Sequence, residues 1–489
     1  MGLQESLLLV LLTPWVGGVL LVLAGRWPNL RDAISVVTSL LLLLAVIALY
    51  NHAGNGTATP PELTLFTMLP GIEVGFRLEP LGMLFVVIAA VLWIINTIYS
   101  IGYMRGNNEK HQTRFYLCFA IAIGATMGLA LSANLLTLFI FYEVLTLSTY
   151  PLVTHKGSMK AARAGRTYLG YLLGTSIAFF LLAIIWTWAL TGTLEFTPRG
   201  IFKQDTDAAS LSLLFVLYIF GIGKAAIMPI HRWLPAAMVA PTPVSALLHA
   251  VAVVKAGVFT ITKVVLYIFG PALTREIPAS EWIVYLAGTT IVVASWIALR
   301  QTNLKRRLAY STISQLSYVI MAAALGTAYA LLAAALHIAV HAFGKITLFF
   351  AAGSIYTATH KTEIPQLKGI GRQMPWTMAA FTIGAVSMVG LPPAAGFLSK
   401  WYLLMGAMQL QAYFVLAVIV ISTLLNAAYF FPIVHAAFFQ PADDDTGKIH
   451  EAPWPVVLAV SCAAVLTLLL FLYPWPVLSL AALVSGATP

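Results

Sequence analysis

The chain has 489 residues, of which 60% are hydrophobic and only 9% are charged, and its formal net charge is +10. Soluble domains carry about 25% charged residues, so this composition excludes a soluble protein. Apolar stretches longer than about 18 residues recur along the chain, and each is long enough to cross a hydrocarbon core about 30 Å thick. The positive charges are spread between these stretches rather than gathered in a basic domain, which argues against nucleic acid as a partner.

Alternating apolar runs and polar breaks predict about fourteen transmembrane helices in a single all-α membrane domain, residues 1–489. The predicted spans are 5–25, 32–50, 81–104, 115–132, 134–154, 166–192, 209–235, 243–269, 281–300, 306–325, 327–357, 377–406, 411–437 and 453–475. No basic residue precedes the first run, so we expect a retained helix rather than a cleaved signal peptide. The two cysteines, Cys118 and Cys462, stand far apart in apolar runs and indicate neither a disulfide nor a metal motif.

The distribution of lysine and arginine predicts how the helices cross the membrane. Seventeen of the 27 basic residues, from Arg26 to Lys448, fall in connectors that follow odd-numbered spans. Only four fall in connectors after even-numbered spans: Arg77, Arg199, Lys203 and Arg275. By the positive-inside rule the first set is cytoplasmic, so we expect both termini on the outer side of a bacterial or archaeal cytoplasmic membrane.

Six basic residues remain within hydrophobic segments or at breaks in them, and one acid, Glu143, lies in the middle of a span. The six are Lys224, Arg232, Lys255, Lys263, Lys345 and Lys400. An ionisable group inside the bilayer costs at least about 2.5–3.5 kcal/mol, so such groups predict a functional pathway with polar partners. Glu143 cannot reach an interface, and Lys224 is its natural countercharge. For Lys263 and Arg232, snorkelling to an interface is the alternative.

Two spans, the seventh and the twelfth, are predicted to be broken. Pro229 and Pro235 interrupt the first, and Pro392 and Pro393 interrupt the second. Broken helices are tolerated in membranes only where they are buried in protein or line a wet cavity. Similar segments, Leu-Pro-Ala-Ala from 234 and Leu-Pro-Pro-Ala-Ala from 391, lie five spans apart, and an odd separation inverts their orientation. We therefore predict three helices in 1–114, two inverted five-helix repeats in 115–269 and 281–437, and a last helix at 453–475.

Histidines and lysines recur on two further spans. His249 and Lys255 share the eighth span, and His337, His341 and Lys345 follow one another at four-residue intervals over about 12 Å of the eleventh. Two histidines at this spacing can bind a metal or haem, but no carboxylate or cysteine is near and a cation follows, so we expect no metal and no cofactor. A buried lysine near a movable carboxylate can alternate between charged and neutral forms. The sequence thus predicts a proton path along Glu143, Lys224, His249, Lys255, His341 or His337, Lys345 and Lys400, with water in the gaps.

These motifs resemble the antiporter-like family shared by respiratory complex I proton-channel subunits, Mrp-type cation/proton antiporters and membrane-bound hydrogenases. The resemblance covers nearly the whole chain and rests on Glu143, the broken segment around Lys224 and four stretches. They are APTPVSALLHAVAVVKAGVF (240–259), NLKRRLAYSTISQLSYV (303–319), HIAVHAFGKITLFFAAGSI (337–355) and GLPPAAGFLSK (390–400). The family implies fourteen helices with inverted repeats, pairing of Glu143 with Lys224, a bridging Lys255, and Lys400 at the end of the second half-channel.

Within this family, Lys400 followed by Trp401, the segment LLNAAYFFPIV (424–434) and a chain ending soon after the fourteenth span resemble the Mrp D-type subunit. The resemblance implies a proton-translocating subunit of a monovalent cation (Na⁺)/H⁺ antiporter, working with other membrane subunits. Two alternatives remain: a proton-pumping subunit of a redox-driven complex, of NADH:quinone oxidoreductase or hydrogenase type, and a subunit of an inorganic-carbon uptake system. Any redox chemistry would belong to partner subunits. Asn303 stands where the family often has aspartate, which suggests a changed proton entry route.

Overall fold

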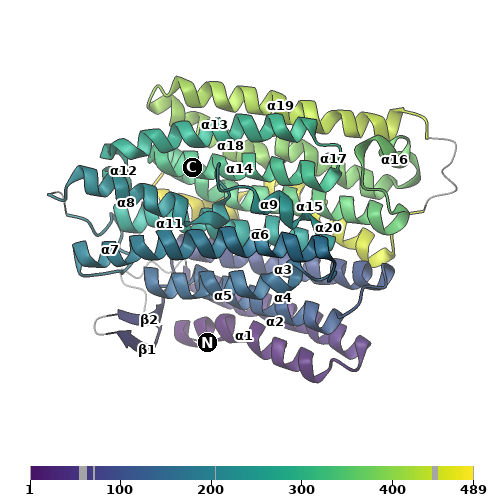
Figure 1. Ribbon diagram of the computed structural model, residues 1–489, viewed down its shortest axis with the longest axis horizontal. Helices are drawn as coiled ribbons and strands as arrows, with labels where there is room; N and C mark the ends of the chain where they lie inside the picture. The colour runs from purple at the N-terminus through teal and green to yellow at the C-terminus, as the bar shows by residue number, and fades with distance from the viewer. Residues whose placement is uncertain (1, 54–62, 70–71, 204, 443–449, 488–489) are drawn as a thin grey trace.

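The computed structural model describes residues 2–53, 63–69, 72–203, 205–442 and 450–487. Their helices lie roughly parallel in one bundle, with α1 and α2 on one flank and α13 and α19 on the other (Figure 1). Among the described residues, twelve helices are long and apolar enough to cross a membrane. Two more spans are each broken into pieces, which brings the total to the fourteen that the sequence predicts. The polytopic helical fold is thereby confirmed.

The unbroken spans follow the predicted order along the chain. Ten are single helices: α1 (Leu3–Leu23), α2 (Pro28–Ala53), α3 (Pro80–Gly106), α4 (Gln112–Ala130), α5 (Leu135–Val153), α13 (Pro278–Arg300), α14 (Leu304–Leu325), α15 (Ala328–Thr359), α19 (Tyr413–Phe439) and α20 (Trp454–Leu472). Two contain π-helical turns: α6 (Met159–Thr175), η1 (Ser176–Leu181) and α7 (Leu182–Thr191) form one, and α10 (Thr242–Ala246), η4 (Leu247–Val251), α11 (Val253–Val264) and η5 (Val265–Phe269) form the other. The α10–η5 span and α15 are the most enclosed, because other helices surround them on all sides.

The seventh and twelfth spans are broken, as predicted. The seventh comprises α8 (Ala208–Gly221), η2 (Gly223–Ala225), α9 (Trp233–Ala236) and η3 (Ala237–Val239), and the twelfth comprises α17 (Pro375–Val389) and α18 (Gly396–Gln409). Proline lacks a backbone N–H and clashes with the preceding turn, so neither segment can continue as one helix. Lys224 lies within the first break, and Lys400 lies in the first turns of the helix after the second.

Side chains at several helix starts fix where the spans begin. Asn134, Ser158, Asp207, Asn303 and Thr327 each accept a hydrogen bond from a backbone N–H in the first turn of the helix that follows. Such caps satisfy donors that have no partner within the helix and typically contribute about 1 kcal/mol each. Four of these helices (α5, α8, α14 and α15) carry or lead directly into residues of the predicted proton path or their partners.

Several details differ from the sequence prediction. The 51–80 connector contains an antiparallel hairpin, β1 (Leu63–Leu69) and β2 (Ile72–Phe76), which lies at one end of the bundle (Figure 1). The sixth span begins at Met159 rather than near 166, because Ser158 caps the helix there. Two arginines lie within its first turns, which is why the sequence pattern placed this part of the helix in a loop. Short helices α12 (Pro271–Glu276), η6 (Ile364–Leu367), α16 (Ile370–Gln373) and α21 (Trp475–Ser485) lie outside the predicted spans. Lys448 lies outside the described residues, and the repeat boundaries 115–269 and 281–437 stay a prediction.

Candidate functional site

The first buried lysine, Lys224, lies on the short turn η2 and points at helix α5. It is fully buried, and its Nζ donates hydrogen bonds to the Tyr142 carbonyl oxygen at 2.7 Å and to Thr146 Oγ1 at 2.6 Å. The same ammonium lies 3.1 Å from the centre of the Tyr142 ring, which is a favourable position for a cation over an aromatic face. The break in the seventh span therefore places the Lys224 side chain against the middle of α5.

Glu143 is on the same turn of α5, between the two residues that hold Lys224. Its two carboxylate oxygens are shielded from solvent and have no hydrogen-bond partner within the described residues. The expected direct pair with Lys224 is therefore not formed in this structure, although the two groups lie on neighbouring positions of one site. A shielded carboxylate without a partner is costly unless it is protonated or solvated by water.

Gly257 on α11 allows the turn that carries Lys224 to lie directly on the next span. A Cβ atom at position 257 would collide with the backbone of Lys224 and Ala225. The absence of a side chain at this one position therefore lets the broken seventh span touch the span that bears Lys255.

Lys255 and His341 connect the two enclosed spans by a hydrogen bond. Lys255 Nζ lies 2.7 Å from His341 Nδ1, and both side chains are fully buried. His249, on the π-helical turn η4 of the Lys255 span, packs its ring 4.6 Å from the ring of Phe349 on α15. Neither ring nitrogen of His249 has a hydrogen-bond partner within the described residues. Turns of π-helix are frequent at functional positions, and this one places an unpartnered imidazole beside α15.

The other two predicted residues on α15, His337 and Lys345, contact α18 and α14. His337 Nδ1 lies 2.8 Å from Ser399 Oγ on α18, so this histidine contacts the residue next to Lys400. Lys345 is fully buried, and its Nζ donates to Ser311 Oγ on α14 at 2.8 Å. The stripe predicted from the four-residue spacing therefore has its three members bonded to three different helices.

A chain of hydrogen bonds that the sequence did not predict joins Lys345 to the site of Lys400. Ser311 Oγ, which accepts from Lys345, lies 2.9 Å from the Tyr429 hydroxyl, and this hydroxyl donates its one proton to Asn426 Oδ1. Asn426 Nδ2 donates to the Met388 carbonyl oxygen at 3.3 Å. Ordinary serine, tyrosine and asparagine residues inside predicted spans give no signal in sequence, and only packing against lysines marks them out.

Lys400 lies at the end of this chain, almost completely buried at 6% exposure. Its Nζ donates to the carbonyl oxygens of Met388 at 3.3 Å and Val389 at 2.7 Å, and to Thr423 Oγ1 at 3.3 Å. The two carbonyls end helix α17, where free carbonyl groups and the helix dipole favour a cation. The second break therefore creates the acceptors that hold its lysine.

The two residues left open by the sequence have different surroundings. Lys263 is fully buried and does not snorkel: its Nζ lies 3.1 Å from Glu79 Oε2 and donates to the Ser132 carbonyl oxygen at 2.7 Å. Glu79, just before α3, was not predicted as a partner because it lies 184 positions away in the sequence. Arg232 is exposed, which agrees with the alternative of an interfacial anchor.

Direct hydrogen bonds group the predicted residues into separate clusters, and the water-filled gaps of the predicted path stay a prediction. Lys255 and His341 are the two predicted residues that bond directly to each other. Lys224, His337, Lys345 and Lys400 bond to neutral groups on neighbouring helices, whereas Glu143 and His249 have no hydrogen-bond partner within the described residues. No three histidine, cysteine, aspartate or glutamate side chains gather at a metal-binding distance within the described ranges.

Comparison with known proteins identifies the family. Residues 132–426, more than half of the chain, match the family model described as "NADH:quinone oxidoreductase/Mrp antiporter, TM", and residues 70–116 match "NADH-Ubiquinone oxidoreductase (complex I), chain 5 N-terminus". The chain therefore belongs to the NADH:quinone oxidoreductase/Mrp antiporter family. It is an antiporter-like membrane subunit of the kind that translocates protons.

Relatives come from both branches of this family. The N subunit of NADH-quinone oxidoreductase from Desulforudis audaxviator is 34% identical over 79% of this chain and 76% of its own length. A protein of Rhizobium meliloti described as a probable K⁺/H⁺ antiporter subunit is 31% identical over 92% of this chain, which spans 45% of that longer protein. A chain of the Mrp complex from a Dietzia species has the same fold, with a TM-score of 0.87 over 99% of this chain and 97% of that one at 20% identity.

Proposed function

We propose that this chain is the proton-translocating subunit of a multisubunit Mrp-type cation/proton antiporter that exchanges protons against Na⁺ or another monovalent cation. Protons would move between Glu143 and Lys224, through His249, Lys255 and the histidines of α15, to Lys345 and Lys400. Membrane partner subunits would complete the antiporter, since the named relatives belong to multisubunit antiporters and respiratory complexes.

One observation carries the proposal. Lys224, Lys255, Lys345 and Lys400 are buried, and every hydrogen bond that their ammonium groups make within the described residues goes to a neutral acceptor. A buried ion pair holds its proton in place, whereas a buried lysine bonded to hydroxyl, imidazole and carbonyl groups can release the proton and stay hydrogen-bonded. Lys263 differs from these four lysines because it is paired with Glu79, and we therefore assign it a structural role outside the proposed path.

The Mrp assignment within the family rests on residues at the second break. Lys400 is followed by Trp401, and Asn426 and Tyr429 of the 424–434 segment form part of the hydrogen-bond chain that ends at Lys400. These residues resemble those of the Mrp D-type subunit, and the antiporter relative from Rhizobium supports the same choice. The second candidate is a proton-pumping subunit of a redox-driven complex, which the 34% identity to an NADH-quinone oxidoreductase subunit favours.

Proton flux in membrane vesicles tests the proposal and separates the two candidates. The chain would be produced with the subunits encoded beside it in bacterial cells that lack their own Na⁺/H⁺ antiporters, and dissipation of an imposed pH gradient would be followed after Na⁺ or K⁺ is added. We expect cation-dependent flux that falls at least tenfold in Lys224→Met, a loss of about 1.4 kcal/mol or more. Lys160→Met, at an exposed lysine of α6, is the matched control and should keep full flux.

Two results would contradict the proposal in different ways. Full flux in Lys224→Met would remove this lysine from the path. Flux that requires NADH or another reductant and ignores Na⁺ and K⁺ would establish the redox candidate instead.

We also propose that both termini lie on the outer side of the cytoplasmic membrane. A cysteine placed at Lys160 in a Cys118→Ser, Cys462→Ser background should react with an impermeant maleimide in inverted vesicles and not in intact cells. The opposite pattern would reverse the topology.

A further inference from the structure

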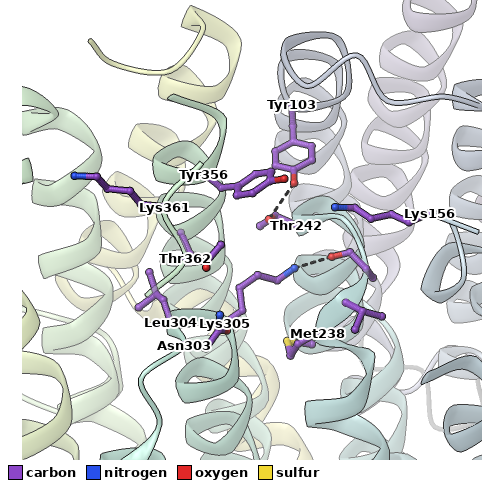
Figure 2. Close-up of a pocket in the computed structure, with 13 residues that line it drawn as sticks. Tyr103, Lys156, Met238, Thr242, Asn303, Leu304, Lys305, Tyr356, Lys361 and Thr362 are labelled. Carbon is purple, nitrogen blue, oxygen red and sulfur yellow. Dashed lines mark hydrogen bonds between the residues drawn. The ribbon is translucent and has the colours of Figure 1, made fainter. Parts of the chain in front are cut away.

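A cavity of about 140 Å³ lies between residues from both halves of the chain (Figure 2). Tyr103, in the last turn of α3, lines it, whereas the β-hairpin precedes the first turn of that helix, so the cavity lies at the opposite end of the bundle. Its walls come from α3, the connector after α5, α10, the start of α14 and the end of α15. Three lysines line it: Lys156 before α6, Lys305 on the first turn of α14, and Lys361 after α15. A single buried water needs only about 10–15 Å³ of such space, so the cavity has room for a larger polar group.

The lining is rich in hydrogen-bond donors and contains no acid. None of the thirteen described lining residues is aspartate or glutamate, whereas hydroxyl groups of Tyr103, Tyr356 and Thr242 face the same space (Figure 2). Lys305 Nζ donates one hydrogen bond, to the Ala240 carbonyl oxygen at 2.6 Å, and an ammonium has three donors. Lys156 Nζ lies 5.7 Å from the centre of the Tyr356 ring. Positive charge therefore gathers here without a lining countercharge.

The acids closest in sequence to the cavity lie outside its lining. Glu363 Oε1 accepts a hydrogen bond from Asn303 Nδ2 at 2.9 Å, and this bond lowers the pKa of Glu363. Glu109 lies 3.9 Å from His155 Nε2, outside the lining. Burial lowers the pKa of His155 to about 4, so that this neighbour of Lys156 adds no charge at neutral pH.

We propose that this cavity is an anion site that binds a phosphate oxyanion, held by Lys156 and Lys305 with the surrounding hydroxyl groups. The amino end of α14, a helix of 22 residues, opens at the same place and adds the positive end of its dipole. Inorganic phosphate and the headgroup of an anionic phospholipid present the same oxygens, so either can supply the group. Only the lipid carries acyl chains, and binding experiments can separate the two sources.

A bound anion would connect both halves of the molecule. Thr242 begins the span that reaches His249 seven residues later, and Lys305 lies in the first turn of the helix that supplies Ser311 to Lys345. Occupancy would therefore tie α10, α14 and α15 together at the end of the bundle opposite the β-hairpin. This inference concerns binding alone and does not depend on which ion the protein exchanges.

Binding can be measured on the full chain in its complex, purified in a neutral detergent. Inorganic phosphate would be titrated by calorimetry against chloride at equal ionic strength, and nanodiscs of phosphatidylglycerol or phosphatidylcholine would be compared by thermal unfolding and by mass spectrometry of retained lipid. We expect saturable phosphate binding, or selective retention of phosphatidylglycerol with a raised Tm, because a ligand that binds the folded state stabilises it. Phosphate binding without lipid selectivity assigns the free ion, and the reverse assigns the lipid.

Variants place the site in this cavity. Lys156→Gln removes an ammonium that makes no other hydrogen bond within the described residues, and should weaken binding at least tenfold without loss of folding. Lys305→Gln should weaken it further but also removes the bond to Ala240, so Lys156→Gln is the deciding variant. Lys160→Gln, an exposed lysine four residues away, should change nothing. Absence of both phosphate and lipid selectivity, or equal loss in the 156 and 160 variants, would overturn the proposal.

Discussion

The two broken spans hold their lysines in opposite ways. At the first break, the lysine leaves its own span and crosses to α5, where Lys224 contacts the Tyr142 ring, its carbonyl and Thr146 beside Glu143. At the second break, Lys400 turns back onto the carbonyl groups that end α17 in its own span. One break thus places its lysine beside a carboxylate, and the other places its lysine on a helix terminus.

The two breaks share some features and differ in the groups that hold the lysine. Both breaks expose backbone groups and both contain a buried lysine, which precedes the prolines at the first break and follows them at the second. The countercharge is not repeated: Glu143 lies beside the first lysine, whereas the second is held by Met388, Val389 and Thr423. We infer that the protonation of Lys224 depends on the charge of Glu143, whereas the protonation of Lys400 depends on the carbonyl groups at the end of α17.

The largest expected effect is the loss of either lysine. Lys224→Met and Lys400→Met should each lower cation-dependent proton flux by about tenfold or more, because each removes a lysine that we propose carries protons. Glu143→Gln should lower flux at the first break by a similar factor, measured in the same vesicles. Unimpaired flux in Glu143→Gln would contradict this distinction, because it would mean that Lys224, like Lys400, needs no neighbouring carboxylate.

Tyr429→Phe examines the hydrogen-bond chain between Lys345 and the second break. Loss of the hydroxyl removes the contacts with Ser311 and Asn426 but keeps the ring, so flux should fall about three- to tenfold while Tm changes little. Tyr402→Phe is the matched control, because that hydroxyl makes no hydrogen bond in the part of the chain that the structure describes. A drop in Tm with unchanged flux would assign Tyr429 to packing.

The smallest expected effect compares the threonine hydroxyls at the two lysines. Thr146 Oγ1 accepts from Lys224 at 2.6 Å, whereas Thr423 Oγ1 accepts from Lys400 at 3.3 Å. Thr146→Val should therefore lower flux about two- to fivefold, and Thr423→Val less than about twofold, since Lys400 keeps two carbonyl partners. The reverse order would mean that the helix end holds Lys400 less firmly than its distances indicate.

Much of the fold follows from the sequence because a bilayer imposes strict rules on a chain. Apolar runs of sufficient length had to become spans, and proline in the seventh and twelfth had to break them. The hairpin in the 51–80 connector was not predicted, since a short two-stranded element outside the membrane leaves little trace in hydropathy. The start of the sixth span was misplaced by about seven residues because its first turns are charged and resemble a loop.

The buried charges themselves were also readable from the sequence. Their cost in a bilayer singled out Glu143, Lys224, Lys255, Lys345 and Lys400. Tertiary structure alone decided their partners, because a hydrogen bond depends on contacts between residues far apart in the chain. It separated Lys263, bonded to Glu79, from lysines that bond neutral groups, and it joined Ser311, Tyr429 and Asn426 into a chain that no local pattern announces. The positions of these groups within apolar spans determined which of them had to be buried, and the packing of the helices determined which residues each of them contacts.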